Sequence, residues 1–438
     1  MNLPAMSASR NQRTGVRGKG IRRLFCALVV GWLLASCLQL DRPLPTQTPP
    51  TPLTASETSL LITLTPDQPA SSTPPTVSSP TAFALQTTPL DPTPTPQVLP
   101  HNNYHIKVQF DYSRHYLQVQ EQVSYTHAAP EEISELVFLV EPNRYPGSFL
   151  MNQIHWSDGT PLENALKGNR LTVTLPRPLE YGRTVALTIS YELNLPEIPP
   201  PSEESRPQPY GYTSRQTNLV DWYPVLPPYQ PGKGWLAHAP GYFGEHQVYQ
   251  SADYRVEIEV AGWQSTGQPM QIAASAPTEH DGNLYRYKVQ NARNFAWSAS
   301  PVYVVSTRQV GEISVSSYAF PYSNEGGEAA LQAAADALRL YSRLYGPYPQ
   351  RSLSIIEADF LDGMEYEGLF FLSRGFYNLY DGTPAGYLTA IAAHETAHQW
   401  WYGLVGNDQA LEPWLDEALC TYSEKLFYEY NYPELLDW

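Results

Sequence analysis

Polar and apolar residues alternate along the chain from about residue 101 to residue 195. Alternation with a period of two is typical of β-strands that bury one face. The clearest runs lie at residues 105–110, 116–119, 171–175 and 185–189, and the pattern resumes at 254–260, 284–289 and 302–305. These runs predict an all-β region of sandwich or saddle type.

The period changes near Glu328. From there, apolar residues recur at spacings of three and four as far as Leu344, which predicts a helix that a Gly-Pro pair ends. Strand-like runs follow at residues 353–356 and 369–372. A β region followed by mixed strands and helices predicts an α+β fold.

Two further helices are expected near the end of the chain. Residues 387–393 suit a buried helix, with Thr383 as its cap and Pro384 at its first position. Pro413 fits the first position of the next helix, whose apolar residues recur at helical spacing as far as Phe427.

The first of these helices carries His394, Glu395 and His398. Residues four apart lie on one helix face, so the two imidazoles can converge on one metal ion. Glu395 stands beside the first histidine, where its carboxylate can hold a metal-bound water and take its proton. This spacing indicates a zinc site with its own catalytic base.

Catalytic zinc usually takes three protein ligands, so a third is expected nearby. The acidic candidates are Glu412, Asp416, Glu417 and Glu424. Glu417 lies about one turn into the second helix and could face the metal if the two helices pack together. Glu424 lies further along and could accept a hydrogen bond from a ligand imidazole. The competing interpretation is a solvated acidic face beside a chance pair of histidines.

The wider sequence resembles the M1 family of zinc metallopeptidases, the gluzincin aminopeptidases. Glu417 follows His398 after eighteen residues, as in that family. The flanking sequences also resemble that family: His-Gln-Trp-Trp begins at His398, and Glu-Pro-Trp-Leu-Asp-Glu ends at Glu417. Residues 363–365, Gly-Met-Glu, resemble the family's exopeptidase motif, with Tyr366 where the family often has Asn. The resemblance runs from about Tyr104 to the end of the chain.

The resemblance implies an all-β N-terminal saddle or sandwich domain followed by the first part of a thermolysin-like catalytic domain. It implies one Zn²⁺ per chain, held by His394, His398 and Glu417. Glu395 would then be the catalytic residue that takes a proton from the attacking water and passes it to the leaving amine.

The same resemblance assigns the substrate site. Gly363, Met364 and Glu365 would line it, and the Glu365 carboxylate would bind the free α-amine of a peptide. That contact would place the first peptide bond at the metal and make the enzyme an aminopeptidase. The family's oxyanion-stabilising tyrosine is expected beyond Trp438, in a continuation of the catalytic domain.

Two other functions stay open on the sequence. One is a zinc endopeptidase of similar chemistry, which would also cleave peptides whose N-terminus is blocked. The other is a lipoprotein whose β region binds a peptide or a partner while the zinc site is inactive.

Charge narrows the choice of partners. The 438 residues carry a net charge of −16, and none of the 43 acidic residues lies within residues 1–37. The part beyond residue 37 is therefore more acidic still. This balance argues against nucleic acid as a partner.

The N-terminus predicts export. A basic stretch precedes an apolar run over residues 24–34, and Leu-Ala-Ser-Cys, ending at Cys37, resembles a bacterial lipobox. We expect residues 1–37 to be a lipoprotein signal peptide. Lipidated Cys37 would then anchor the protein to a membrane of the bacterial cell envelope. An uncleaved anchor or an ordinary signal peptide is the alternative.

Residues 38–100 are rich in Pro, Thr and Ser and carry few charges. Such a segment buries too little apolar surface to fold, so we expect a disordered linker. The expected order of domains continues with a β domain over residues 101–318 and ends with a zinc peptidase domain, incomplete here, over residues 319–438. Cys420 is expected to be a small, buried packing residue.

Overall fold

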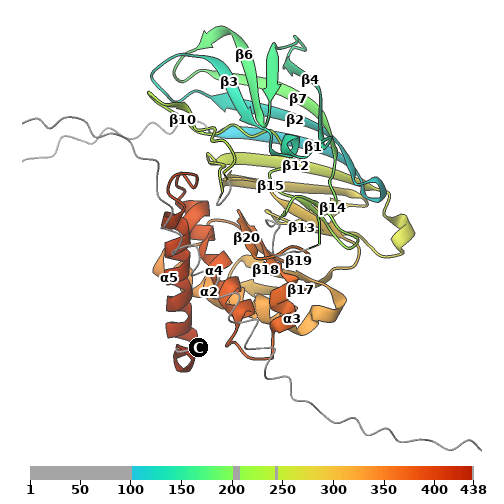
Figure 1. Cartoon of the computed structure of the whole chain (residues 1–438), viewed down its shortest axis with the longest axis vertical. Helices are drawn as coiled ribbons and strands as arrows, with labels where there is room; N and C mark the ends of the chain where they lie inside the picture. The colour runs from blue at the N-terminus through green and yellow to red at the C-terminus, as the bar shows by residue number, and fades with distance from the viewer. Residues whose placement is uncertain (1–100, 201–207, 242–244, 437–438) are drawn as a thin grey trace, which may run out of the picture. The chain divides into compact units, whose positions relative to one another are not determined.

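Strands occupy most of the first part of the chain, as the alternating pattern predicts. The computed structural model describes residues 101–200, 208–241 and 245–436 (Figure 1). The largest sheet has seven strands in the order β14-β15-β12-β1-β2-β7-β4. Their bounds are β1 Asn102–Asp111, β2 Tyr116–Thr126, β4 Phe149–Trp156, β7 Thr184–Asn194, β12 Ala252–Ala261, β14 Glu279–Asp281 and β15 Leu284–Ala292.

The registers of β1 explain its alternation. It pairs in parallel with β12, Ile106 opposite Val256, and antiparallel with β2, Val108 opposite Val119. All four of these side chains are buried, while their neighbours along the strands are mostly exposed. Period-two patterning therefore corresponds to one buried face, as expected.

Smaller sheets complete the β region. The three-stranded sheet runs β3-β6-β5 and the four-stranded sheet runs β13-β16-β9-β8, while β10 and β11 form a hairpin. The bounds are β3 Ile133–Leu139, β5 Asn164–Lys167, β6 Arg170–Leu179, β8 Gly211–Tyr212, β9 Thr217–Leu219, β10 Tyr229–Gln230, β11 Gly234–Trp235, β13 Gln271–Ala274 and β16 Trp297–Ser300.

A five-stranded mixed sheet supports the second part of the chain. Its order is β17-β18-β19-β21-β20, and β20 is an edge strand antiparallel to β21. The bounds are β17 Val304–Val310, β18 Ile313–Ala319, β19 Ser352–Ala358, β20 Gly363–Tyr366 and β21 Leu369–Ser373. Because β18 pairs in parallel with β19, this sheet begins before residue 319. The domain boundary at residues 318 and 319 stays a prediction.

Helices pack with this sheet, and Figure 1 shows α2, α4 and α5 gathered beside it. The bounds are α2 Asn324–Leu344, α3 Arg374–Leu379, α4 Tyr387–Ala397 and α5 Trp414–Asn431; the wide turn η5 spans Gln399–Leu404. Single-turn helices lie at Tyr112–Arg114, Glu141–Arg144, Gln264–Thr266, Pro321–Ser323 and Pro433–Leu435. The predicted α+β fold is confirmed.

The expected start of α4 is wrong. The helix begins at Tyr387 and is preceded by Gly386. Thr383 does not cap it, because its hydroxyl and its backbone N–H both donate to the Asp381 carboxylate. Asp381 thus holds Thr383 and Pro384 in a turn outside the helix.

Among the residues that the structure describes, no helix has the length and apolar character needed to cross a membrane. The predicted signal peptide, Cys37 and the linker over residues 38–100 lie outside the described residues. Cys420 is a free, buried cysteine in α5, as expected.

Candidate active site

The two motif histidines lie at the C-terminal end of α4. His394 is in its last turn and His398 immediately follows the helix. Their ring centroids are 5.0 Å apart. His398 is 1% exposed, whereas His394 retains some contact with solvent. The short helical spacing brings both imidazoles to one side of the helix end.

Glu417 reaches this pair from the first turn of α5. Its Oε2 lies 3.2 Å from His394 Nε2, and one ligand atom each from His394, His398 and Glu417 lie within 4.8 Å of one another. Ligand atoms bonded to tetrahedral zinc at roughly 2.0–2.1 Å stand about 3.3 Å apart. The three side chains therefore fit a zinc ion with little rearrangement.

The surroundings of the Glu395 carboxylate independently favour a cation nearby. The side chain is 5% exposed, and its Oε2 is buried without a hydrogen-bond partner. Burial, together with the charge of Glu417, outweighs the opposing effect of His394 and raises the pKa of Glu395 to about 8. A divalent cation at the three ligands would relieve this crowding of negative charge.

The protonation preferences of the ligands differ. Burial, reinforced by His394, lowers the pKa of His398 to about 4, so this imidazole is neutral and able to bind a metal. Burial disfavours the charged form of His394, but hydrogen bonds to Glu417 and Glu424 outweigh it and raise its pKa to about 10. Glu424 Oε2 lies 3.5 Å from His394 Nδ1, on the ring nitrogen away from Glu417.

Glu365 lies on the edge strand β20 and is 6% exposed. Its Oε1 is 3.9 Å from His398 Nδ1. Burial and the nearby carboxylates of Glu245 and Glu395 raise its pKa well above the ordinary range. A cationic group bound here would give Glu365 a counter-charge that the described residues do not provide.

Gly363 lets β20 approach α4 closely. A Cβ at this position would stand 1.8 Å from Glu395 Oε1. The missing side chain therefore leaves room for the carboxylate of the predicted base. Met364 pairs with Phe371 of β21 and packs against the main hydrophobic core.

A cavity of about 410 Å³ opens beside β20. Gly363, Met364 and Glu365 line it together with the β-region acids Asp221 and Glu245. Burial and the charges of Glu417 and Asp416 raise the pKa of Glu245 to about 8. Another cavity, of about 970 Å³, runs along β1, β2 and β12 and contains none of the predicted site residues.

The backbone after His398 leaves regular helical geometry. Trp401 and Tyr402 have non-helical dihedral angles within the wide turn η5. Arg293 holds this turn: its Nε donates to Tyr402 O at 2.6 Å and to Gly403 O at 3.0 Å. A Cβ on Gly406 would stand 2.3 Å from the guanidinium carbon, so that glycine makes room for Arg293.

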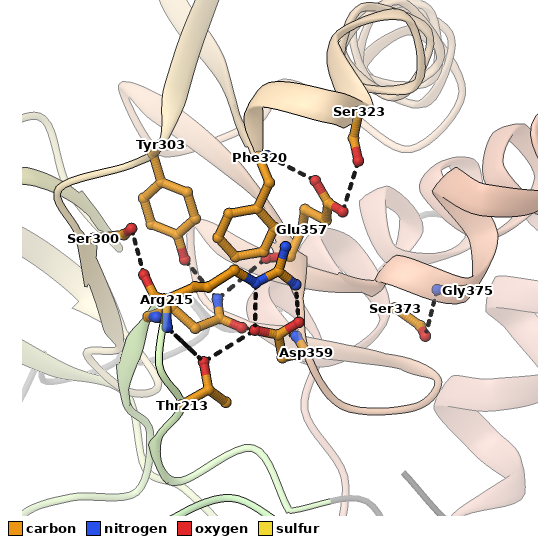
Figure 2. A network of polar contacts seen from close by, with 11 residues as sticks. Thr213, Arg215, Ser300, Tyr303, Phe320, Ser323, Glu357, Asp359, Ser373 and Gly375 are labelled. Carbon is orange, nitrogen blue, oxygen red and sulfur yellow. Dashed lines mark hydrogen bonds and ion pairs between the residues drawn. The ribbon is translucent and has the colours of Figure 1, made fainter. Parts of the chain in front are cut away.

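A polar network holds the loop that leads from β19 to Gly363 (Figure 2). Asp359 accepts hydrogen bonds from the Arg215 guanidinium and, at 3.0 Å, from the Thr213 hydroxyl. Its backbone N–H donates to Gln216 Oε1 at 2.7 Å. The Arg215 guanidinium also lies over the Phe320 ring, 3.7 Å from its centroid. The β region thereby fixes the start of the loop that leads to β20, the strand on which Gly363, Met364 and Glu365 lie.

The structure thus brings together all the site residues predicted within its described part: His394, Glu395, His398, Glu417, Glu424, Glu365, Gly363 and Met364. Sequence reasoning missed Glu245, Asp221, Arg215 and Arg293. No spacing motif marks these four, because each reaches the site from a distant part of the chain.

Comparisons with known proteins agree with this geometry. No protein-family model matches the chain. A segment of 131 residues is 34% identical to human endoplasmic reticulum aminopeptidase 2, covering 28% of this chain and 14% of that protein. A segment of 124 residues is 33% identical to aminopeptidase M1-D of rice, covering 26% and 14%. The match spans about a seventh of the length of these curated relatives.

Among solved structures, one of a two-domain M1 zinc metallopeptidase mutant bound to L-tryptophan has a TM-score of 0.50 at 17% identity. The alignment covers 75% of this chain and 71% of that one. This likeness concerns the fold over three quarters of the chain, a larger share than the matched sequence segments cover. Sequence and fold point the same way: a segment of the chain is similar to curated aminopeptidases, and the described fold is similar to that of a solved M1 zinc metallopeptidase.

Proposed function

We propose that the protein is a zinc-dependent aminopeptidase that removes the first residue from peptides with a free N-terminus. One zinc ion per chain would bind His394, His398 and Glu417. The convergence of these three side chains supports the metal site. The curated aminopeptidases are far longer than the segment that matches this chain, so the peptidase activity of this protein is itself proposed.

Zinc supplies Lewis-acid chemistry that polarises a carbonyl and lowers the pKa of a water molecule. The chain's own residues do the rest. Glu395 is placed to accept a proton from the attacking water and to return it to the leaving amine. Its buried, unpartnered Oε2 supports this role, because that atom has a free lone pair facing no protein donor.

Glu365 is the residue that favours an aminopeptidase over an endopeptidase. Its buried carboxylate lies 3.9 Å from a ligand imidazole and lines the cavity beside β20. A peptide whose α-ammonium is bound at Glu365 would therefore have its first residue beside the metal ligands. Charge-assisted contacts of this kind contribute about 1.5–3 kcal/mol.

A comparison of free and N-acetylated peptides tests the proposal in the full-length protein. The free peptide should be cleaved at least tenfold faster, because acetylation removes the charge that pairs with Glu365. Glu365→Ala should shrink this difference mainly by slowing the free peptide. Glu259→Gln, which neutralises an exposed acid of β12, is the matched control and should keep it. Equal cleavage of both peptides would favour the endopeptidase, and cleavage of neither would favour the binding protein.

Metal analysis tests the zinc site separately from activity. The wild type should contain one zinc ion per chain, and His398→Ala should lose most of it. Glu259→Gln serves again as a control for purification and folding. Equal zinc content in wild type and His398→Ala would contradict the assigned ligand set.

We also propose that lipidated Cys37 anchors the enzyme at the bacterial cell envelope. The lipobox-like Leu-Ala-Ser-Cys and the Pro/Thr/Ser-rich segment that follows support this. Cys37→Ser should abolish fatty-acid labelling and release the protein from the membrane fraction. A variant that still labels and stays with the membrane would show that another segment is the anchor.

A further inference from the structure

Gln399 is a fully buried residue that the proposed mechanism does not use. It directly follows the second motif histidine, His398. Its Nε2 donates to Tyr366 O at 3.0 Å, while its Oε1 accepts from Gly368 N–H at 2.8 Å and from the Tyr348 hydroxyl at 3.3 Å. A carbonyl only accepts and a backbone N–H only donates, so these partners fix the orientation of the amide.

The two backbone partners of this amide flank the turn that joins β20 to β21. Tyr366 pairs with Leu369 across the hairpin, so Glu367 and Gly368 form the turn. Gly368 has a left-handed backbone with φ of 69°, and a Cβ there would stand 2.5 Å from Ser275 O of the β region. Only glycine suits this conformation and this close approach. The turn is therefore packed closely against the β region.

A second side-chain amide binds the same turn. Asn294 of the β region accepts from Glu367 N–H at 3.1 Å, and its Nδ2 donates to the Tyr402 hydroxyl at 2.6 Å. Tyr402 belongs to η5, which begins at Gln399. The β20–β21 turn and η5 are therefore joined directly through Gln399 and indirectly through Asn294, and both amides are buried.

Strand β20 is paired along one edge only. In the part of the chain that the structure describes, it lies at the end of its sheet and pairs with β21 alone. Glu365, the proposed α-amine site, directly precedes Tyr366, and the zinc ligand His398 directly precedes Gln399. The bond from Gln399 to Tyr366 therefore connects the neighbour of a metal ligand to the neighbour of the α-amine site.

The distance between the α-amine site and the metal ligands matters because the first residue of a peptide has a fixed length. Its α-ammonium and the carbonyl of its first peptide bond are joined through a single carbon atom, Cα. When Glu365 holds the ammonium, the carbonyl reaches the metal only if β20 stands at the matching distance. A misplacement of about 1 Å can cost roughly a hundredfold in rate.

We propose that Gln399 is a positioning residue that sets the α-amine site at the distance from the metal ligands that a peptide's first residue requires. The inference rests on the proposed aminopeptidase function, because only an enzyme that binds the α-amine needs this spacing. Gln399→Met keeps the length of the side chain and removes its hydrogen bonds. The variant should keep its zinc and lower kcat for a free peptide about tenfold to a hundredfold. KM should change less than about threefold, because Glu365 still binds the ammonium.

A double-mutant cycle in the full-length, zinc-loaded enzyme tests whether Gln399 acts through Glu365. The wild type, Gln399→Met, Glu365→Ala and the variant with both changes are compared on one free peptide. Without the Glu365 carboxylate the spacing no longer matters, so adding Gln399→Met should lower kcat/KM by less than about threefold further. A merely structural residue would lower kcat/KM by the same factor in both backgrounds, and that result overturns the inference.

Tyr285→Phe is the control for lost stability. It removes a buried hydrogen bond of the β region, from the Tyr285 hydroxyl to Met270 O at 3.0 Å, and Tyr285 does not line the cavity beside β20. This variant should keep the wild-type kcat. Gln399→Asn, one methylene shorter, cannot reach both Tyr366 and Gly368. It should lower kcat in the same direction and provides a second measurement if Gln399→Met folds poorly.

The remaining outcomes separate this inference from the proposed function. Loss of zinc from either Gln399 variant would show that the residue supports the metal ligands, and would overturn the inference. A wild-type kcat in both variants would overturn it as well, and neither result affects the aminopeptidase assignment. A wild type that cleaves free and acetylated peptides equally, or cleaves neither, refutes the proposed function and this inference with it.

Discussion

Buried carboxylates dominate the active site at the scale of single residues. Glu365 and Glu395 are both almost fully buried, and Glu245 lies beside Glu365 in the cavity. Burial and mutual repulsion raise the pKa of each of the three. Such crowding is unfavourable in a resting chain, and it becomes favourable when cations bind. This arrangement would suit the metal ion and the substrate ammonium proposed above.

Glu395→Gln should retain zinc and lose turnover, because an amide cannot accept the proton of the attacking water. General-base catalysis contributes roughly 10²–10⁴-fold, so kcat should fall within that range. Metal analysis and steady-state kinetics on one preparation measure both effects. A zinc-loaded variant with wild-type kcat would show that Glu395 is not the catalytic base.

Gly363→Ala should reduce activity without unfolding the protein. The added methyl group would overlap Glu395 Oε1, which lies at the free end of a side chain and can move aside. Displacing a catalytic group by about 1 Å costs roughly a hundredfold in rate. Kinetics and thermal unfolding, compared with the wild type, separate the two effects. A large fall in melting temperature with intact kcat would assign Gly363 a purely structural role.

At the scale of elements, the turn η5 decides where His398 lies. A helix continued past Ala397 would carry the residues after His398 along the axis of α4. Instead Gly403 N–H bonds to His398 O at 2.9 Å, and Arg293 binds the carbonyls of Tyr402 and Gly403. Arg293 Nη1 also donates to Tyr249 O at 3.0 Å. One arginine of the β region therefore fastens the segment that follows the second histidine.

Arg293→Met should loosen this turn. Three carbonyl acceptors lose their donor, and at about 1 kcal/mol for each net hydrogen bond the cost is about 2–3 kcal/mol of unfolding free energy. Zinc affinity, measured by competition with a chelator, should fall as well. Arg177→Met removes an exposed arginine of β6 and should change neither quantity. Unchanged zinc affinity despite lower stability would show that the turn does not position His398.

At the scale of the whole molecule, the β region and the helical part build one site. Asp221, Glu245 and Arg293 come from the first part of the chain, and the zinc histidines come from the second. The Arg215–Asp359 pair joins the two at the loop before Gly363. A truncation at the predicted boundary would therefore remove site residues as well as a supporting domain.

The core of the β region also contains an acid. Glu121 is fully buried on β2, with Tyr191 donating to Oε2 at 3.2 Å and Oε1 without a partner. Burial, only partly offset by the Tyr191 hydrogen bond, raises its pKa well above the ordinary value of 4.5. The folded state therefore holds this proton more tightly than the unfolded state. The resulting stability is fully present below about pH 4.5 and is lost as pH rises toward the folded-state pKa.

Glu121→Gln should remove that pH dependence. The stability of the variant relative to wild type should increase with pH above about 4.5, by up to about 1.4 kcal/mol per pH unit within the window. Denaturant unfolding at pH 5 and pH 8 measures it. The exposed control Glu259→Gln should show no such trend. A constant difference between variant and wild type across pH would mean that Glu121 is not held protonated.

Features that depend on neighbours in the chain were determined by the sequence itself. The alternation in β1, the helical spacing in α2 and the four-residue step from His394 to His398 all follow from backbone periodicities of 2.0 and 3.6 residues. Glu417 joined the histidines because it occupies the first turn of a helix that packs on theirs. The convergence of His394, His398 and Glu417 and the α+β class were therefore predictable from the sequence.

Features that depend on distant partners were decided only by the tertiary structure. Glu245 and Arg293 acquire their roles from residues more than 100 positions away, and no local pattern encodes that proximity. The start of α4 was misjudged for a related reason, since Asp381 competes for the groups of Thr383 that would cap the helix. Periodicity specifies which face of an element is buried. Which groups meet across that face depends on how the whole chain packs.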